Sequence, residues 1–331
     1  MTAVLFTCAG QRVDIVTEFG KAGAFTVATD VDPLAPAIYH ADRQAFVPPV
    51  DDEDYVPALA ALVRDYDVRL IVPLTDLDHE VLARERDRLD AFVLLPALDV
   101  VQAVADKYLA HKRFEELGLP SPPTWLPGEL PDEVPFPVLV KDRRGFGSRH
   151  IFRAHDRREL DFFLAYTPAE SMVQQYCAGE EFSVDVFCDR EGRCLNAIPR
   201  TMIESKGGES IKGMTIKDWE LIEHGRLVSE TLRLVGPANI QCFRQPDGSL
   251  PVTDVNPRFG GAFPLPRAAG SGYPELAIAL ANGEEPEPRL GEFREGVVMT
   301  RFFSHLCLTA GDSGTLELFA EEVPQPLVPE P

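Results

Sequence analysis

The sequence predicts an α/β fold in which a parallel-sheet domain is followed by an α+β domain. Over the first hundred residues, short apolar runs alternate with segments of helical period, which is typical of a parallel sheet with right-handed crossovers. A proline-rich stretch at Pro120–Pro137 then leads into a series of strands with hairpin signals and few helices between them. The length of 331 residues fits two or three domains.

The elements of the N-terminal part follow from apolar period. Short apolar runs predict buried strands, and apolar residues spaced three and four apart predict the helices between them. A further helix is expected from Asp106, which can cap it, to Gly118 and Pro120, which end it. The expected strands are Ala3–Thr7, Phe25–Thr29, Leu70–Pro73 and Phe92–Leu95, and the expected helices are Val13–Ala22, Tyr55–Tyr66 and His79–Leu89.

The second part is expected to be built mainly from antiparallel strands. A hairpin signal at Pro246-Asp247-Gly248 joins the last two of them. The expected strands are Val138–Lys141, His150–Arg153, Met172–Tyr176, Phe182–Phe187, Cys194–Pro199, Asn239–Phe243 and Val252–Val255, and the expected helices are Asp156–Leu164, Asp218–Val235 and Tyr273–Ala281.

The composition disfavours several classes of protein. A formal net charge of −21 argues against a nucleic-acid-binding protein, which would present a basic face. No apolar run approaches the ~18–20 residues of a membrane span, and the N-terminus lacks a signal-peptide pattern. Six cysteines, none in a C-x-x-C pair, indicate free thiols in a reducing compartment. We therefore expect a cytoplasmic protein that binds neither nucleic acid nor membrane.

The segment Asp254-Val255-Asn256-Pro257-Arg258 carries the clearest chemistry. Alternate side chains of a strand share a face, so the Asp254 carboxylate and the Asn256 amide point the same way. The expected hairpin would bring Gln241 alongside them. Three such oxygens suit Mg²⁺ (or Mn²⁺), and Arg258 could hold a phosphate or carboxylate oxygen nearby. The alternative is a surface strand that ends in an Asn-Pro turn.

A basic glycine loop follows Lys141, with the sequence DRRGFGS at residues 142–148. Glycines let the backbone approach phosphate closely, and successive N–H groups can form an anion nest. Lys141, Arg143 and Arg144 add positive charge in an otherwise acidic chain. The loop is not a Walker A motif, and the alternative is a plain hairpin.

A third segment runs from Gln174 to Glu181 and turns at Gly179. Its extended backbone could hydrogen-bond an adenine edge, and the Glu181 carboxylate could accept both ribose hydroxyls. An ordinary hairpin with polar turn residues is the alternative.

The order of these features resembles that of the ATP-grasp superfamily: Lys107 at a helix start, Lys141 before its glycine loop, the 174–181 segment, and then Gln241 with DVNPRFGG. The resemblance covers about residues 1–305 and is closest to the branch that contains the carbamoyl-phosphate synthase large subunit. It implies a Rossmann-like pre-ATP-grasp domain at 1–103 and a two-lobed ATP-grasp domain at 104–306, whose mobile lid lobe spans about 122–178. Residues 307–331 would form an acidic, proline-bearing tail.

The resemblance also implies a role for each matching position, with ATP as co-substrate and Mg²⁺ (or Mn²⁺) as cofactor. Asp254 stands where the family usually has a glutamate, and Gln174 where it often has an acid. The implied ATP-binding residues are Lys107, Lys141, Gly145, Gly147, Ser148, Gln174, Gln175, Tyr176 and Glu181; the implied metal ligands are Gln241, Asp254 and Asn256; and Arg258 lies near the γ-phosphate and acyl phosphate.

Arg200 and Lys212 are further candidates for the catalytic machinery. They belong to a polar, glycine-bearing segment that lies near the acceptor pocket in the branch that this chain resembles. There they would grip a substrate carboxylate or the phosphate in transfer. The alternative is a solvated loop.

The resemblance therefore implies an ATP-dependent carboxylate–amine ligase that forms an amide through an acyl phosphate and releases ADP and phosphate. Amino acids are the favoured substrates and a homodimer the favoured assembly. Three alternatives stay open: an enzyme that forms carbamoyl or carboxy phosphate, a non-catalytic ATP-binding regulator, and a nicotinamide dehydrogenase. The last rests on the Cys8–Arg12 turn and Asp30, but the full G-x-G-x-x-G motif is missing.

Overall fold

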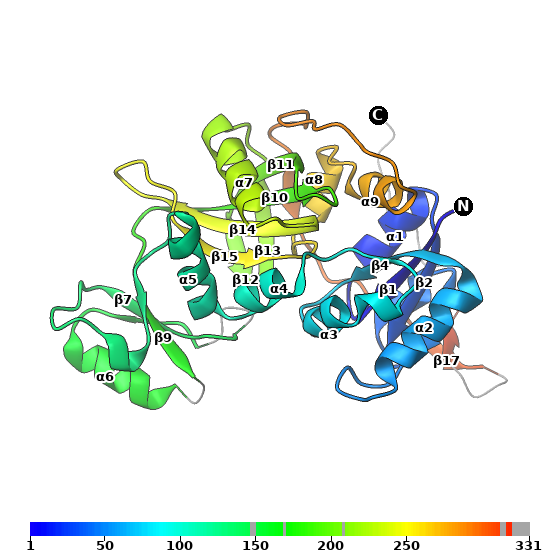
Figure 1. Ribbon diagram of the computed structural model, residues 1–331, viewed down its shortest axis with the longest axis horizontal. Coiled ribbons are helices and arrows are strands. Elements are labelled where there is room, and N and C mark those ends of the chain that lie inside the picture. Colours follow the sequence, from blue (N-terminus) through cyan, green and yellow to red (C-terminus); the bar gives the residue numbers. More distant parts are fainter. Residues whose placement is uncertain (146–149, 168–169, 207–208, 312–315, 320–331) are drawn as a thin grey trace.

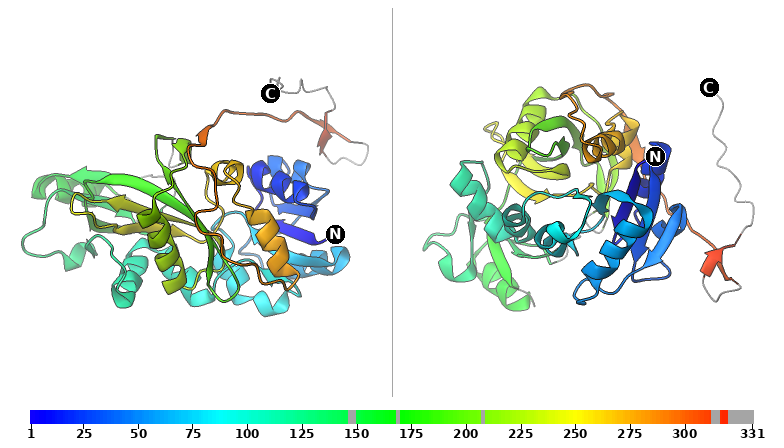
Figure 2. Two further views of the ribbon diagram at one scale, coloured as in Figure 1. Left: turned by 90° about the horizontal axis from the view of Figure 1, so that it is seen from above. Right: turned by 45° about the vertical axis from the view of Figure 1, so that its right-hand side comes forward.

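The computed structural model describes residues 1–145, 150–167, 170–206, 209–311 and 316–319. The molecule is elongated, with the N-terminal sheet at one end, a small lobe at the other and a larger sheet between them (Figure 1 and Figure 2). Among the described helices, none is long and apolar enough to cross a membrane.

The N-terminal part is a parallel sheet, as the sequence predicted, with five strands in the order β3-β2-β1-β4-β5. Alternate residues of the central strand enter two cores: Val4 and Phe6 pack with the first helix, and Leu5 packs with the second on the other face. The elements are β1 (Ala3–Thr7), α1 (Val13–Lys21), β2 (Phe25–Asp30), η1 (Pro36–His40), β3 (Arg43–Phe46), α2 (Tyr55–Tyr66), β4 (Val68–Pro73), α3 (His79–Arg84), η2 (Arg86–Arg88) and β5 (Phe92–Val93).

The short helix η1, strand β3 and helix α4 (Leu98–Ala105) were not predicted in this region. Strand β3 is mostly exposed at the sheet edge, so its sequence RQAF lacks the apolar run that marks a buried strand. Helix α4 follows the sheet and leads directly into α5 (Lys107–Leu117), where Asp106 is the N-cap and Gly118 the C-cap, as expected.

The larger sheet is antiparallel, with the order β11-β10-β14-β15. Helix α7 covers one face so closely that a Cβ atom on its Gly225 would lie 2.6 Å from Val184 Cγ1. Val184 points toward α7, so Ser183 and Asp185 point to the opposite face. Helices α4 and α5 pack against β15. The elements are β10 (Glu180–Cys188), β11 (Cys194–Thr201), α7 (Trp219–Thr231), β14 (Gly236–Arg244), β15 (Val252–Asn256), α8 (Pro264–Ala268) and α9 (Tyr273–Ala281).

The small lobe is a second four-stranded sheet in the order β6-β9-β7-β8, with its own apolar core around Val138, Val140 and Leu160. Its place in the chain matches the expected lid, but the domain boundaries and the motion of the lobe stay predictions. The elements are β6 (Thr124–Trp125), η3 (Pro127–Glu129), β7 (Val138–Asp142), β8 (Phe152–Ala154), α6 (Arg157–Tyr166) and β9 (Ser171–Gln175).

The polar segment after Arg200 contains strands that the sequence pattern did not predict. Strands β12 (Glu204–Lys206) and β13 (Glu209–Met214) form a sheet with β16 (Val298–Thr300). Within the expected tail, β17 (Leu308–Ala310) pairs with β18 (Leu316–Leu318). These strands are three to six residues long, too short to show an apolar period, and β13 also pairs with the distant β16, which is why the pattern missed them.

Candidate active site

Polar side chains form a row across the face of the larger sheet that lies opposite α7. In the strand register, Gln241 lies opposite Asp254, and Asn239 opposite Asn256. Ser183 lies opposite Gln241 on the next strand, and Arg200 opposite Ser183 beyond it. Directly opposed residues share a face. The hairpin therefore does bring the three expected metal ligands together.

Two lysines converge on Asp254. The Nζ of Lys107 lies 3.5 Å from Asp254 Oδ1 and donates to the Gly145 carbonyl at 3.0 Å. Lys141 is buried, and burial, reinforced by the nearby charge of Lys107, lowers its pKa to about 8. The charges of Asp254 and Glu181 oppose this shift. The fold thus places two cations and the start of the glycine loop beside the metal-ligand row.

Lys107 is held in place by Asp106. The Asp106 carboxylate accepts from the backbone N–H groups of Tyr108 and Leu109 and is fully buried. It also accepts from Arg143 Nη2 at 2.7 Å. The Asp106 carboxylate therefore caps α5. Through Arg143 it also links α5, which begins at Lys107, to the end of β7, which carries Lys141.

Replacing Asp106 by alanine is expected to lower the free energy of unfolding by about 3 kcal/mol, because a helix cap and a buried charged hydrogen bond are lost together. Urea unfolding measures this. The matched control is Asp156→Ala, since Asp156 caps α6 through the Glu159 N–H alone at an exposed site. That change should cost about 1 kcal/mol, and equal losses in both variants would show that Asp106 is only a cap.

Glu181 lies in the same cluster. Burial raises its pKa, against the lowering influence of Arg200 and Lys141. Cys177 adjoins Lys141, and burial raises the pKa of its thiol to about 11. Glu181 is thus within electrostatic reach of Arg200 and Lys141, and it lies two residues before Ser183 on β10.

Arg258 joins the two parts of the chain. Its Nε donates to Asp76 Oδ1 at 3.0 Å, and Asp76 follows β4 at the carboxyl edge of the parallel sheet. Its Nη2 donates to Asn256 Oδ1 at 3.3 Å. Arg12 makes a second link: its Nη1 donates to the Phe259 carbonyl and its Nη2 donates to the Gly260 carbonyl. The DVNPRFGG segment is therefore fixed to the N-terminal domain by two arginines.

The expected adenine segment begins at the end of β9 in the small lobe and leads toward β10 of the larger sheet. Gln174 is buried and its Nε2 donates to Thr124 Oγ1 at 2.9 Å. The N–H of Gln175 donates to the Pro123 carbonyl, and the Tyr176 ring lies 3.8 Å from Arg153 Cζ. Gln174 therefore already has a partner within the small lobe.

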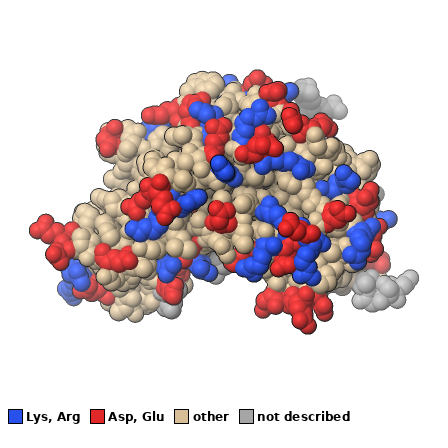
Figure 3. Space-filling model, viewed as in Figure 1, with Lys and Arg blue, Asp and Glu red and all other residues tan. Residues whose placement is uncertain are grey.

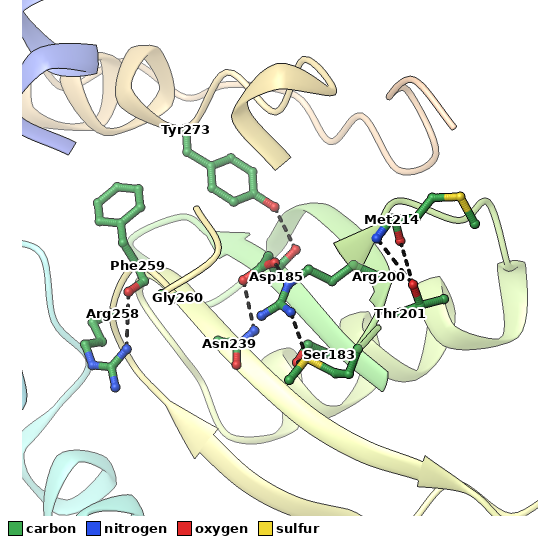
Figure 4. Close-up of polar contacts among 12 residues, drawn as sticks. Ser183, Asp185, Arg200, Thr201, Met214, Asn239, Arg258, Phe259, Gly260 and Tyr273 are labelled. Carbon is green, nitrogen blue, oxygen red and sulfur yellow. Dashed lines mark hydrogen bonds and ion pairs between the residues drawn. The ribbon is translucent and has the colours of Figure 1, made fainter. Parts of the chain in front are cut away.

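Arg200 and Lys212 have different surroundings. Arg200 is buried, and its Nε donates to Asp185 Oδ2 at 2.8 Å (Figure 4). Lys212 is half-exposed in an ion pair with Glu204 at 2.5 Å. Of the remaining expected residues, Gly147 and Ser148 lie outside the described residues.

The N-terminal turn is structural. The Gly10 N–H donates to Asp30 Oδ2 at 2.8 Å, so this carboxylate is used within the turn itself. Burial is the main cause that raises the pKa of the Cys8 thiol to about 12. The Asp30 carboxylate is therefore already hydrogen-bonded to the turn, whereas in a dinucleotide site it would bind a ribose hydroxyl. The raised pKa keeps the Cys8 thiol protonated at neutral pH.

The row fits a hard metal ion by its donor chemistry. In the described part of the chain, no group of three or more His, Cys, Asp or Glu side chains could hold a metal, so the amides of Gln241 and Asn256 must contribute. Burial raises the pKa of Asp254, yet Lys107, Lys141 and the Asn256 amide lower it overall. A charged carboxylate with amide oxygens suits Mg²⁺. Asn256 would have to exchange its contact with Arg258 for the metal.

Several contributing residues were not predicted: Asp76, Asp185 and Asn239. Asp76 follows a parallel strand at its carboxyl end, the usual location of ligand-binding residues in such sheets. Asn239 precedes Gln241 by two positions and therefore shares its face. Both signals were present in the sequence. On the face of the molecule that Figure 3 shows, acidic and basic side chains are mixed.

Two family models match the chain in succession. A model of the PylC-like N-terminal domain matches residues 4–94, and a model described as ATP-grasp in the biosynthetic pathway with Ter operon matches residues 167–302. The chain is a member of the ATP-grasp superfamily. The two matches cover the parallel sheet and the larger antiparallel sheet of this ATP-grasp protein, the two parts that carry the predicted fold.

Relatives of this ATP-grasp protein include the carbamoyl phosphate synthase large chain of Pyrococcus furiosus, which is 24% identical over 215 residues, 58% of this chain and 20% of that protein. The chain thus spans about a fifth of the length of that relative. The L-amino acid ligase from Bacillus licheniformis has the same fold, with 17% identity, a TM-score of 0.67 and coverage of 89% of this chain and 78% of that one.

A second solved structure with this fold is the biotin carboxylase domain of 2-oxoglutarate carboxylase from Hydrogenobacter thermophilus, in complex with MgADP, ADP and bicarbonate. It is 19% identical, with a TM-score of 0.71 and coverage of 90% of this chain and 73% of that chain. At these identities the two structures establish the fold and leave the substrate open.

Proposed function

We propose that this protein is a magnesium-dependent carboxylate–amine ligase that forms a C–N bond and acts on small molecules, with amino acids as the favoured class. The observation that carries the proposal is the convergence of Lys107 and Lys141 on Asp254, directly opposite Gln241. Two cations beside a hard-oxygen row suit a nucleoside triphosphate with its metal. The proposed compartment is the cytoplasm, since all six cysteines are free thiols.

In this proposal Lys107 and Lys141 bind the phosphates of ATP, and Glu181 binds the ribose. Gln241, Asp254 and Asn256 would hold Mg²⁺, which supplies charge neutralisation to the phosphates when it is bound. The resemblance also assigns backbone of residues 174–176 to the adenine, and the loop that begins at Gly145 to the phosphates.

The reaction then proceeds in two displacements. A carboxylate oxygen of the acid attacks the γ-phosphorus of ATP, the bond to the β–γ bridging oxygen breaks, and ADP leaves. An amine nitrogen next attacks the carbonyl carbon of the acyl phosphate, phosphate leaves, and the amine loses a proton to solvent. Arg258 and Arg200 stabilise the negative oxygens that develop, because positioning and charge stabilisation supply most of the catalysis in phosphoryl transfer.

An ADP-release screen over pairs of amino acids with Mg²⁺ tests the proposal, with mass spectrometry of the product. The expected result is ADP release that depends on both an acid and an amine, together with a product whose mass is the sum of the two minus water. ATP binding without turnover for any pair would overturn it in favour of a non-catalytic regulator.

An enzyme that forms carboxy or carbamoyl phosphate is the second candidate. It is favoured by the carbamoyl phosphate synthase relative and by the bicarbonate anion in the complex of the 2-oxoglutarate carboxylase domain. ADP release that depends on bicarbonate and not on an amino acid would select it.

A further inference from the structure

A buried polar cluster lies next to the metal-ligand row and takes no part in the mechanism above except through Arg200. It consists of Asp185 on β10, Arg200 on β11 and Asn239 on β14, each at most 4% exposed. Asn239 lies directly opposite both Asp185 and Asn256, the expected metal ligand. The cluster therefore lies on the same face of the sheet as the metal-ligand row, opposite α7, and Asn239 is directly beside Asn256.

Asp185 is held from three sides, as Figure 4 shows. Its Oδ2 accepts from Arg200 Nε at 2.8 Å, and its Oδ1 accepts from Asn239 Nδ2 at 2.9 Å. Its backbone carbonyl accepts from the Tyr273 hydroxyl at 2.7 Å. These contacts fix both oxygens of the carboxylate, and through them the position of the Arg200 guanidinium.

The contacts of Arg200 leave part of the guanidinium without a strong acceptor. Nε is bound to Asp185, and Nη1 faces the thioether of Met202 at 3.1 Å, which is a weak acceptor. Within the described residues, Nη2 donates no hydrogen bond. Nη2 is not one of the buried, unpaired side-chain atoms of the described residues, so it is accessible from solvent. Such an arrangement suits an anionic ligand that completes the donors when it binds.

The loop after Arg258 closes over this cluster. A Cβ atom on Gly260 would lie 2.7 Å from Asp185 Oδ1 and 3.3 Å from Asn239 Cβ. The Gly260 carbonyl is in turn held by Arg12 Nη2 at 3.0 Å. The glycine of DVNPRFGG thus allows its backbone to cover the Asp185 carboxylate, which excludes water from the pair and strengthens it.

We propose that Asp185, supported by Asn239, is a positioning residue. It fixes Arg200 through Nε, so that the terminal N–H groups bind an oxyanion at the reacting centre. That oxyanion is the carboxylate of the acid substrate or the phosphoryl group in transfer, which share the same hydrogen-bond chemistry. The inference rests on the proposed function and extends it to a residue with no direct contact with the nucleotide.

The first test is Asp185→Asn, which keeps the shape of the side chain and removes the charge that orients Arg200. Calorimetry measures binding of MgADP, and then of inorganic phosphate to the MgADP complex. A parallel assay measures ADP release from MgATP as an equimolar mixture of the twenty amino acids is titrated. We expect phosphate binding, or the half-saturating amino-acid concentration, to weaken by about tenfold, as expected for the loss of one charged contact, while MgADP binds as in the wild type.

The matched control is Asp189→Asn. Asp189 is also buried and pairs with Arg193 Nε at 2.9 Å, but it lies in the turn just beyond β10. This variant removes an Asp–Arg pair of similar geometry whose arginine is 43% exposed, and it should leave the two anion assays unchanged. An effect in the phosphate assay identifies the transferring group as the ligand of Arg200, and an effect in the amino-acid assay identifies the carboxylate.

A double-variant cycle separates positioning from general destabilisation. If Asp185 acts through Arg200, then Asp185→Asn should have no further effect on anion binding in an Arg200→Met background. An additional loss there, or wild-type anion binding by Asp185→Asn, would overturn the inference while the proposed function stands. A wild-type protein that fails to bind MgADP would instead overturn the proposed function, and this inference with it.

Discussion

Asp254→Ala is expected to abolish magnesium-dependent ATP turnover while the protein remains folded. Asp254 is the one carboxylate among the three expected metal ligands, and it faces Lys107 at 3.5 Å. Its charge is favoured by both lysines, which lower its pKa although burial acts to raise it. Without this carboxylate, two amides remain to hold a divalent cation, and neutral amide oxygens bind Mg²⁺ weakly.

Turnover should fall by about a hundredfold or more, since charge stabilisation by the metal is worth several kcal/mol. ADP release with saturating Mg²⁺ measures this, and calorimetry with ADP in the absence of Mg²⁺ should show that the nucleotide still binds. The control is Asp247→Ala, which removes an exposed carboxylate from the hairpin that joins β14 to β15. Full activity of Asp254→Ala would show that the metal assignment is wrong.

The sequence was most informative where local pattern and tertiary structure agree. Helices α2 and α9 begin and end at the predicted residues, because their apolar period and flanking turns are local signals. Strand β3 and the β12–β13 hairpin were missed because they are short and polar, and because β3 and β13 also pair with other strands, β2 and β16. Such pairing depends on the assembled fold and leaves little trace in the chain itself.

The same distinction applies to the candidate site. Gln241 and Asp254 could be paired from the sequence, because a short hairpin fixes their register. Asp76 could not be paired in this way, because it reaches Arg258 across 182 residues of sequence. Strands β10 and β11 are joined by the short turn 189–193, so the closeness of Asp185 and Arg200 was open to the same argument as that of Gln241 and Asp254. The contacts within each hairpin were therefore predictable, whereas the contact between Arg258 and the N-terminal domain required the structure.

Lys141→Met is expected to weaken nucleotide binding and to stabilise the protein at neutral pH. Lys141 lies on β7 and is buried, and burial together with Lys107 lowers its pKa from 10.5 to about 8. A shift of this size means that the charged form costs about 3 kcal/mol in the folded state. Methionine fills a similar volume without that cost.

The pH dependence has a definite sign. Because the folded-state pKa lies below the unfolded value, the destabilisation by charged Lys141 is fully present below about pH 8 and disappears as the pH rises from about 8 to 10.5. Urea unfolding should therefore show a gain of up to about 3 kcal/mol for Lys141→Met at pH 7, and little difference from the wild type near pH 10.5. The control, Lys112→Met, changes a half-exposed lysine on α5 and should move stability little.

Nucleotide binding should change in the opposite direction. A bound phosphate restores the charge of Lys141, so the wild type should take up a proton on binding ADP near pH 8.5, which calorimetry in buffers of different ionisation enthalpy detects. Affinity for ADP should fall by about tenfold or more in Lys141→Met, as a charged hydrogen bond to phosphate is lost. If Lys141→Met is less stable at pH 7 and still binds ADP as the wild type does, the assignment of Lys141 to the phosphates is wrong. A stabilised variant without affinity would show that the protein retains a buried charge, at a cost in stability, because the phosphates require it.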